Sequence, residues 1–337
     1  MTGHHDVGGH PAGPVERLEA VPSHWQKRLE AMRDCLARRT PAVMHVDEMR
    51  RGIEELDSAL YAELDFYQRK TLAIRNVLVE RGVLEAAELE AAIDWLRRER
   101  EKDRVVAREL PEHRAQGHDH DHDHDHDSRD ADDLRGDAVS GTAAVDAYEL
   151  LSEAMIQGLV ARGLLVPGEL RAGVERAETA GPALGARIVA RAWIDGQFKA
   201  ALLADGRAAM ALIGIEALEA QIIVVENTPQ VHNLVVCTLC SCYPRSILGS
   251  APAWYVGKQY RARAVREPRR VLEEFGLVLD QAVQLRVHDS TANMRYLVLP
   301  QRPDGTRDWP AGRLEALVTR DSLIGVARAL DPGVQAS

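Results

Sequence analysis

A stretch of ten residues in the middle of the chain constrains the fold more than any other feature. From His118 to Asp127, histidine and aspartate alternate strictly in five pairs, with no apolar side chain among them. Such a segment has nothing to bury and is expected to be disordered. The chain is therefore expected to fold as two units around a linker, and we predict domains at residues 1–110 and 143–330 with the linker at 111–142.

The histidine-aspartate tract also permits a functional interpretation. Histidine-rich tracts bind transition metals weakly. Two interpretations follow from its composition. The tract is a solvated spacer, or it collects metal and delivers it to a site elsewhere in the molecule.

The first unit is predicted to be helical after an extended arm over residues 1–24 that is rich in glycine, proline and histidine. Apolar residues recur at three- and four-residue steps at Leu29, Met32 and Leu36, which is the spacing of one helix face. The helical pattern continues to about residue 104.

Two segments of the chain repeat each other. Residues 78–84 resemble residues 159–165, and a Glu-Leu pair follows each of them. Both contain a glycine, Gly82 and Gly163, just after an apolar helical run. Glycine adopts the left-handed conformation that closes a helix, so both segments are predicted to end one helix and lead into the next.

The second unit is predicted to place helices before strands. Helical periodicity covers residues 145–160, 170–178 and 182–203. Short β-branched runs then appear at 222–225 and 234–236, and again within 284–299. Runs of this kind are typical of strands, so the fold class is α+β, with an α/β layered part at the C-terminal end.

The charge of the chain excludes some partners. Its formal net charge is −10, and an acidic chain repels the phosphate backbone of nucleic acids. No run of 18 or more apolar residues indicates a membrane span. The first residues lack the basic-then-apolar layout of a signal peptide, so we expect a cytoplasmic protein.

Three of the four cysteines gather in one short motif at Cys237, Cys240 and Cys242. A disulfide framework would spread its cysteines over distant segments, whereas clustering in a cytosolic chain indicates metal binding or redox chemistry. The fourth, Cys35, stands alone in a helical pattern and is expected to be a small buried residue.

The number of thiols leaves more than one metal open. Structural zinc sites use four side chains, so zinc would need a further ligand such as His232 or His288. An iron–sulfur cluster normally takes four cysteines, and Cys35 is the remaining one. Both alternatives stay open on spacing alone.

A third arrangement uses the backbone. The spacing of Cys240, Ser241 and Cys242 permits the thiolates, together with the amide nitrogens of Ser241 and Cys242, to face a single metal. Soft thiolates with anionic amides suit trivalent cobalt or iron better than zinc. One coordination position would remain for water or substrate, as a catalytic site requires.

The motif has a family resemblance. Residues 236–244, Val-Cys-Thr-Leu-Cys-Ser-Cys-Tyr-Pro, resemble the metal-binding signature of the nitrile hydratase α subunit and the thiocyanate hydrolase γ subunit. Further stretches between about 145 and 328 resemble the same family, including 191–193, 225–229, 231–234, 254–255, 271–276 and 318–322. Threonine at 238 follows the cobalt-type pattern, whereas the iron type has serine there.

This resemblance implies a cofactor and a site. It implies one cobalt(III) ion per chain, with iron(III) as the alternative, held by Cys237, Cys240, Ser241 and Cys242. It further implies that Cys240 is a sulfinate and Cys242 a sulfenate, while Cys237 stays a thiolate. We take Cys242, Ser241 and Tyr243 of the signature as candidate catalytic residues.

The N-terminal unit resembles another subunit. Residues 5–9, 13–14 and 47–50, with Trp25, are similar to the N-terminal half of the nitrile hydratase β subunit. Arg50 matches the family arginine that reaches the oxidised cysteines. The chain thus resembles a β N-terminal half fused to an α subunit. This implies a hetero-oligomer with a separate small-barrel subunit, and a metallochaperone or activator as a further candidate partner.

The residue after the signature bears on the substrate. Arg245 stands where many nitrile hydratases have tryptophan, and thiocyanate hydrolase has arginine there; a cation suits a small anion. Residues 226–229 and much of 185–206 resemble nitrile hydratase instead. We predict hydration of a nitrile to its amide, with thiocyanate hydrolysis as the alternative and a non-enzymatic cobalt carrier as the rival. If Arg245 points away from the substrate, it pairs with Glu267 or with the partner subunit.

Overall fold

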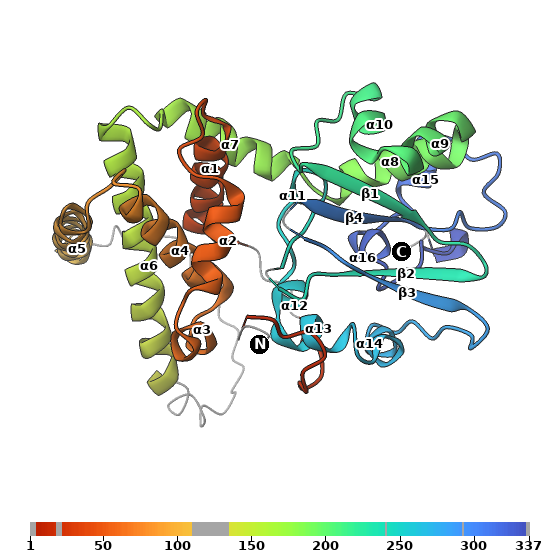
Figure 1. Cartoon of the computed structure of the whole chain (residues 1–337), viewed down its shortest axis with the longest axis horizontal. Helices are drawn as coiled ribbons and strands as arrows, with labels where there is room; N and C mark the ends of the chain where they lie inside the picture. The colour runs from red at the N-terminus through yellow and green to blue at the C-terminus, as the bar shows by residue number, and fades with distance from the viewer. Residues whose placement is uncertain (1–4, 18–21, 110–134, 240, 292, 335–337) are drawn as a thin grey trace, which may run out of the picture.

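The computed structural model describes residues 5–17, 22–109, 135–239, 241–291 and 293–334, with the backbone alone for 104–109, 135–146 and 334. Within these residues a helical part and an α/β part lie side by side (Figure 1). The histidine-aspartate tract falls outside the described residues, so its predicted disorder and the domain boundaries stay predictions.

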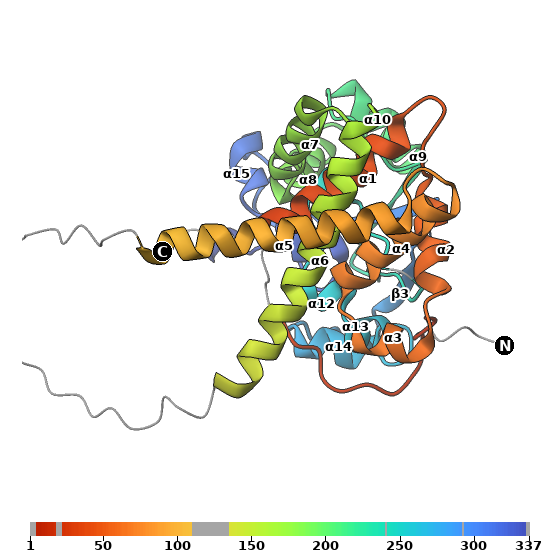
Figure 2. The same ribbon diagram turned by 90° about the vertical axis from the view of Figure 1, so that its left-hand side faces the viewer.

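The helical part is built on the apolar stripe predicted from the sequence. Leu29, Met32 and Leu36 are fully buried in one core. The helices are α1 (His24–Arg38), α2 (Val46–Glu54), α3 (Ser58–Glu63), α4 (Phe66–Glu80), α5 (Ala86–Glu109), α6 (Arg135–Ala161) and α7 (Pro167–Thr179). Both α6 and α7 pack against α1, and α5 crosses α6 (Figure 2). Helices on both sides of the linker thus share one core.

The two repeated segments adopt the same turn, as predicted. Gly82 and Gly163 have φ angles of 65° and 67°. In each turn the amide that follows the glycine donates back to a helix carbonyl, Val83 to Leu78 and Leu164 to Leu159, both at 2.9 Å. The left-handed glycine lets this bond form at the end of the helix.

The α/β part contains the predicted strands. They are β1 (Gln221–Glu226), β2 (Val231–Val236), β3 (Gln284–Asp289) and β4 (Met294–Leu299). β1 pairs in parallel with β4, and β2 in parallel with β3. Parallel strands tend to be buried on both faces, and β2 and β4 are largely buried here, whereas no residue of β3 is buried.

Helices enclose these strands (Figure 1). Above them lie α8 (Pro182–Ile194), α9 (Gly196–Ala204), α10 (Gly206–Leu212) and α15 (Ala311–Glu315). Below lie α12 (Ala253–Val256), α13 (Lys258–Arg263) and α14 (Pro268–Glu274). α11 (Arg245–Leu248) follows β2, and α16 (Arg320–Ile324) and a short 3₁₀ turn (Pro332–Val334) end the described chain.

Two helix boundaries differ from the prediction. The helix predicted over 182–203 breaks at Asp195, because the Asp195 carboxylate accepts hydrogen bonds from the amides of Gln197 at 2.9 Å and Phe198 at 3.0 Å. This N-cap starts a new helix. The helix predicted from Val145 begins earlier, at Arg135.

The N-terminal arm crosses from the helical part to the α/β part. It runs beside α13 and α14 (Figure 1). The Gly9 amide donates to the Ala262 carbonyl at 2.9 Å, and the Val15 amide donates to the Glu274 carboxylate at 2.9 Å. The arm around Gly9 and Val15 therefore lies against the α/β part.

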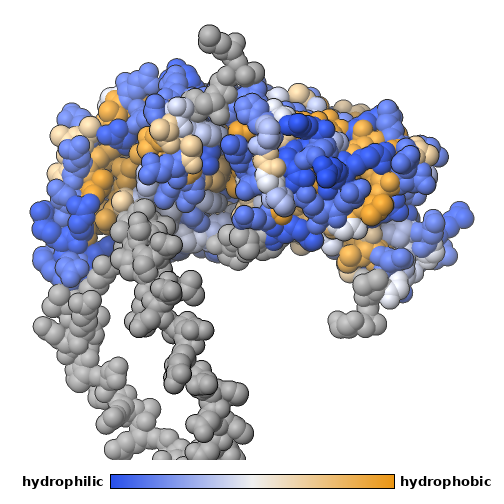
Figure 3. Space-filling view, turned by 90° about the horizontal axis from the view of Figure 1, so that it is seen from below, coloured by the Kyte–Doolittle hydropathy of each residue, from blue (hydrophilic) through white to orange (hydrophobic). Residues whose placement is uncertain are grey.

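The outer surface is mixed. Seen from below, it is mostly hydrophilic, with hydrophobic patches at both ends (Figure 3). Among the described residues, no helix combines the length and the apolar character that crossing a membrane requires.

Candidate metal centre

The cysteine motif forms the loop that follows β2. The carboxyl ends of β2 and β3 lie at the same edge, since the two strands are parallel, and this edge faces the helical part (Figure 1). Cys237, Ser241 and Cys242 are all buried there. Cys240, the remaining predicted ligand, lies outside the described residues. The structure therefore brings three of the four predicted ligand residues into one buried loop.

The backbone of this loop is strained at Ser241. Its φ angle is 63°, and it is the one non-glycine residue of the described chain with a positive φ. A side chain in this region costs about 1–2 kcal/mol. Strain of this kind persists where the surroundings impose it, and it commonly marks a ligand-binding loop.

Asp289 holds the start of the loop. The Thr238 amide donates to Asp289 Oδ1 at 3.0 Å, and the Thr238 hydroxyl donates to Oδ2 at 2.6 Å. Asp289 is the last residue of β3, directly beside Val236 in register. On the other side Gly8 packs so closely that a β-carbon would lie 3.1 Å from Thr238 Cγ2. The arm thus covers the loop where the sheet ends.

Arg261 on α13 binds the backbone of the loop through hydrogen bonds. Its Nε donates to the Cys237 carbonyl at 3.2 Å, and its Nη2 donates to the carbonyls of Thr238 and Leu239, each at 2.7 Å. Its remaining contacts are the His5 carbonyl at 3.2 Å and the Tyr61 hydroxyl at 3.4 Å. No sequence pattern indicates this role, because α13 follows the motif without a recognisable spacing.

Tyrosines hold the end of the loop. The Tyr255 hydroxyl donates to the Cys242 carbonyl at 2.8 Å, and burial raises the pKa of Tyr255 well above its usual value. The predicted site residue Tyr243 is buried and meets the Tyr255 ring edge-on, with centroids 5.1 Å apart. These contacts fix the direction in which the chain leaves the motif.

Arg245 forms an ion pair with Glu30 of α1. The suggested partner Glu267 is wrong, because Glu267 pairs with Arg263 and Arg270 on its own side of the α/β part. Sequence reasoning missed Glu30, which lies 215 residues away along the chain. The Arg245 side chain is 21% exposed, and that of Glu30 4%.

Glu30 also binds two cations from its own part, Lys70 and Arg33. We call Glu30, Arg33, Lys70 and Arg245 the Glu30 cluster. Burial alone would raise the pKa of Glu30, but Arg245, Lys70 and Arg33 together lower it far below its usual value. Burial lowers the pKa of Lys70 to about 8, against the opposing effect of Glu30. The Glu30 carboxylate is thus ionised and compensates Arg245.

Arg50 lies on α2 and is partly buried. Its Nε donates to Glu54 Oε1 at 2.9 Å, one turn further along the same helix. The predicted reach of Arg50 to the oxidised cysteines concerns a modified Cys240 and Cys242, and it stays a prediction.

The histidines proposed as zinc ligands are engaged elsewhere. His232 Nε2 lies 2.7 Å from the Gly325 carbonyl oxygen, and its Nδ1 lies 3.3 Å from the Asn227 amide. His288 Nε2 lies 2.8 Å from Asn233 Oδ1. These bonds do not favour the zinc alternative. Cys35 is buried in the core of the helical part, as expected, so it does not complete an iron–sulfur set.

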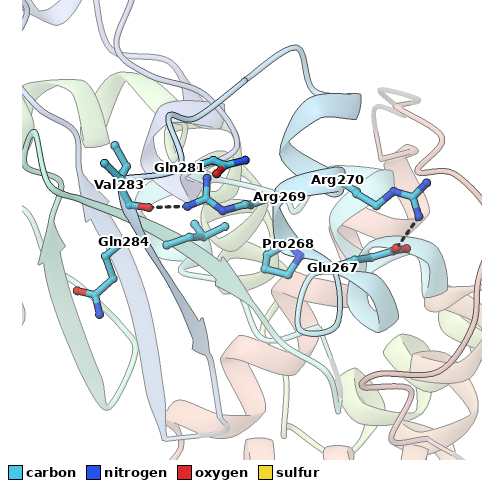
Figure 4. Close-up of a pocket in the computed structure, with 9 residues that line it drawn as sticks. Glu267, Pro268, Arg269, Arg270, Gln281, Val283 and Gln284 are labelled. Carbon is cyan, nitrogen blue, oxygen red and sulfur yellow. Dashed lines mark hydrogen bonds and ion pairs between the residues drawn. The ribbon is translucent and has the colours of Figure 1, made fainter.

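A hollow of about 510 Å³ lies at the other end of β3, between this strand and α14. Arg269 points across it and donates to the Val283 carbonyl, while Arg270 turns toward Glu267 (Figure 4). Because this hollow meets β3 at Gln284, whereas the cysteine loop meets it at Asp289, the two are separate features of the fold.

The donor chemistry of the loop fits a metal. Cys237 and Cys242 offer soft sulfur ligands in a buried setting, and the strained Ser241 backbone lies directly between the motif's last two cysteines. Thiolates in this setting suit a trivalent transition metal of the cobalt or iron type. The residues present therefore fit the predicted centre.

Comparison with known proteins identifies both parts of the chain. Residues 146–327 match the family described as "Nitrile hydratase, alpha chain", and residues 1–121 match "Nitrile hydratase beta subunit, N-terminal". The match to an individual β subunit covers less than half of that protein. The chain is 37% identical to a nitrile hydratase subunit beta of Pseudomonas putida and covers 42% of it.

Two relatives of the second part are named as subunits of different enzymes. The chain is 54% identical over 153 residues to a low-molecular weight cobalt-containing nitrile hydratase subunit alpha of Rhodococcus rhodochrous, covering 45% of this chain and 74% of that protein. It is 41% identical over 195 residues to a thiocyanate hydrolase subunit gamma of Thiobacillus thioparus, covering 54% and 80%.

Solved structures give the same picture. A mutant of thiocyanate hydrolase matches with a TM-score of 0.53 at 40% identity, over 56% of this chain and 91% of that chain. A mutant of the Fe-type nitrile hydratase from Comamonas testosteroni Ni1 matches with a TM-score of 0.51 at 41% identity, over 59% and 95%.

Proposed function

Since the chain belongs to the nitrile hydratase family, as a β-type N-terminal region fused to an α-type domain, we propose that it is the metal-bearing subunit of an enzyme that hydrates a carbon–nitrogen triple bond. The reaction converts a neutral nitrile to its amide. Thiocyanate hydrolysis, which yields carbonyl sulfide and ammonia, is the second candidate.

The observation that carries the proposal is the buried cysteine loop at the edge where the two parts of the chain meet. Its carbonyls are held by Arg261 and Tyr255, and its backbone is strained at Ser241. A loop fixed by the protein in this way is prepared for its ligand before the ligand binds, which is what a reactive metal centre requires.

We propose cobalt(III) as the metal, one per chain, with iron(III) as the alternative. Cys237, Cys240 and Cys242 would hold it together with the amide nitrogens of Ser241 and Cys242. Threonine at 238 and the cobalt-containing relatives support cobalt, and the Fe-type structure supports the alternative. When bound, the metal supplies Lewis-acid activation of the carbon–nitrogen bond or of water.

The residues of the chain have separate tasks in this proposal. Arg261 and Tyr255 orient the loop. Arg50 donates to the oxygen atoms of the oxidised Cys240 and Cys242 in charge-assisted hydrogen bonds, and Tyr243 bounds the site from within the motif.

The surroundings of Arg245 favour a neutral substrate. Its guanidinium forms an ion pair with Glu30, which reduces its field at distances beyond the pair, although Glu30 also pairs with Lys70 and Arg33. A neutral nitrile does not need a cation, whereas the thiocyanate anion would benefit from one. The presence of an arginine at 245 and the thiocyanate hydrolase relative support the second candidate.

We propose that the chain works in a hetero-oligomer. Its β-type region matches only the N-terminal part of that subunit, so the partner is a small-barrel subunit resembling the C-terminal half. A metallochaperone or activator is the second proposed partner, since the centre needs a metal inserted and cysteines oxidised.

The test is co-expression of the chain with such a small-barrel subunit in cobalt medium, followed by assays on acrylonitrile and thiocyanate. We expect about one cobalt per chain and formation of the amide. Ammonia from thiocyanate without amide would establish the second candidate. Cobalt without either activity would support the rival interpretation as a carrier.

Two cysteine variants serve as test and control. Cys240→Ala should abolish cobalt binding and activity. Cys35→Ala makes the same chemical change in the helical core, where Cys35 is buried away from the loop, and should retain cobalt. Zinc bound through four side chains would contradict the catalytic proposal.

A further inference from the structure

Arg261 has unusual surroundings for a buried charge. The residue is 3% exposed. All five of its hydrogen bonds go to uncharged oxygens, four main-chain carbonyls and the Tyr61 hydroxyl. No carboxylate of the described residues forms an ion pair with it. Buried charges in proteins are normally paired or bound to metals, so its counter-charge needs a source.

Arg263, two residues further along α13, shows the usual arrangement. It is also buried, at 6% exposed, and it pairs with the carboxylates of Glu267 and Glu274. The same helix therefore carries two buried arginines, one with two anions and one with none among the described residues.

A second cation lies close to Arg261. The Arg69 guanidinium stacks on the Tyr61 ring at 4.3 Å, and its Nε donates to the carbonyls of Leu64 at 3.0 Å and Asp65 at 3.2 Å. Burial lowers the pKa of Arg69, and the nearby Arg261 lowers it further. Two cations that contact the same tyrosine repel each other, and a neighbouring anion would relieve that repulsion.

The bonds of Arg261 indicate where that anion lies. Three of its four carbonyl partners belong to the consecutive residues 237–239, so the guanidinium lies against the cysteine loop. In the proposed centre, the Cys237 thiolate, the oxidised and anionic Cys240 and Cys242, and two deprotonated amides would carry more negative charge than a trivalent metal cancels. The loop would then be the anion that Arg261 faces.

We propose that Arg261 is a positioning residue of the metal centre: it spans three successive carbonyls of the cysteine loop, and its positive charge is balanced by the anionic, metal-loaded loop. The inference rests on the proposed function and adds a residue to it. Arg261 acts through the loop and contacts neither metal nor substrate.

Substitutions can separate the effect of the positive charge of Arg261 from the effect of its binding three carbonyls at once. Arg261→Lys keeps the charge but offers one ammonium in place of a planar fork, so it cannot reach three carbonyls with the same geometry. Arg261→Gln removes the charge and keeps a polar donor. Arg263→Gln is the matched control, because it removes a buried arginine of the same helix that has its own carboxylates.

The experiment measures cobalt per chain after expression at limiting cobalt, and the visible charge-transfer absorption of the loaded protein. We expect Arg261→Gln to lower cobalt per chain at least tenfold relative to the wild type. Arg261→Lys should keep more than half of the cobalt with a shifted absorption band. Arg263→Gln should load cobalt and absorb as the wild type does, even if it unfolds more easily.

Three results would overturn the inference. Normal cobalt and an unshifted band in Arg261→Gln would show that the loop does not need the charge. Equal loss of cobalt in both Arg261 variants would remove the role of charge, and equal loss in Arg263→Gln would reduce it to general stability. A wild type without cobalt would contradict the proposed function as well, which separates the two failures. If Arg261→Gln does not fold, the comparison of Arg261→Lys with Arg263→Gln still decides: cobalt in Arg261→Lys as low as background contradicts the inference.

Discussion

Two arginines flank the cysteine loop, the buried Arg261 and the partly buried Arg245, and their partners differ. Arg245 belongs to the Glu30 cluster, where a buried carboxylate binds it from the helical part. Arg261 meets uncharged oxygens, mostly from the loop itself. The first arginine has a carboxylate among its partners, whereas the second has none among the described residues. The contrast teaches that an arginine beside a site reports on the ligand only when the protein has not already neutralised it.

The Glu30 cluster holds one carboxylate against three cations, although Arg33 also pairs with Asp34. Burial is the main cause of the lowered pKa of Lys70, and Arg245 and Arg33 lower it further, against the opposing effect of Glu30. The following predictions test whether the two arginines differ as the structure indicates.

The largest effect is expected from Glu30→Gln. Removing this carboxylate leaves Lys70 and Arg245 as buried cations without their shared anion, and breaking a buried ion pair costs about 3–5 kcal/mol. The measurement is the free energy of unfolding in urea. Glu178→Gln is the control, because it removes an exposed partner of Lys27 in a surface pair and should leave the midpoint nearly unchanged. Equal midpoints for both variants would contradict the importance of the Glu30 cluster.

The pH dependence of stability should report on Lys70. Its pKa is lowered to about 8 from 10.5, so the unfolded chain binds more protons than the folded chain between these pH values. Stability therefore rises with pH across this window, by about 2 kcal/mol, and does not depend on Lys70 below it.

The difference between wild type and Lys70→Met isolates this contribution from tyrosine and cysteine titration. Lys70→Met leaves Glu30 with Arg245 and Arg33. As the pH rises from 8 to 10, the unfolding free energy of the wild type should increase relative to that of Lys70→Met. A constant difference would mean that folding leaves the pKa of Lys70 unperturbed.

Tyr61→Phe tests the weaker contact of Arg261. The Tyr61 hydroxyl accepts from Nη1 at 3.4 Å, a long bond, so its loss should cost about 1 kcal/mol or less. Cobalt per chain should stay at the wild-type value, because the carbonyls of the loop hold the guanidinium. A loss of cobalt as large as in Arg261→Gln would mean that the Tyr61 contact in the helical part, and not the carbonyls of the loop, holds the guanidinium in place.

The smallest effect is expected on substrate preference in Arg245→Trp. With Glu30 already compensating the guanidinium, the ratio of kcat/KM for nitrile and thiocyanate should change by less than about threefold, roughly 0.7 kcal/mol. Both activities should fall together if the loss of the ion pair disturbs the contact with α1. A change of tenfold or more in the ratio would mean that Arg245 selects the anion.

The sequence predicted what depends on neighbours along the chain. The turns at Gly82 and Gly163 and the β-branched strands follow from local preferences, and they were confirmed. The cysteine motif predicted a metal-binding loop, because ligand types and spacing are local too. The break at Asp195 was missed since an apolar stripe spanned it, although aspartate followed by glycine is itself an N-cap signal.

The surroundings of the two arginines could not be predicted in the same way. Glu30 and Arg245 are 215 residues apart in the chain, and Arg261 reaches His5 over 256 residues. Such pairs depend on how the helical part docks on the α/β part, and no period or motif in the sequence encodes it. Charged residues on a helix predict an exposed face. A charged residue that is buried instead can be recognised only when the positions of the neighbouring elements are known.

The joining of two subunit types in one polypeptide changes how this contact responds to dilution. Relatives are named as separate α and β subunits, and any contact between two separate subunits weakens on dilution. Here Glu30 and Arg245 are held at an effective concentration set by the chain itself, which does not fall when the protein is diluted. The stoichiometry of the two parts is fixed at one to one by translation, so a weak contact between them is tolerated without loss of the pair.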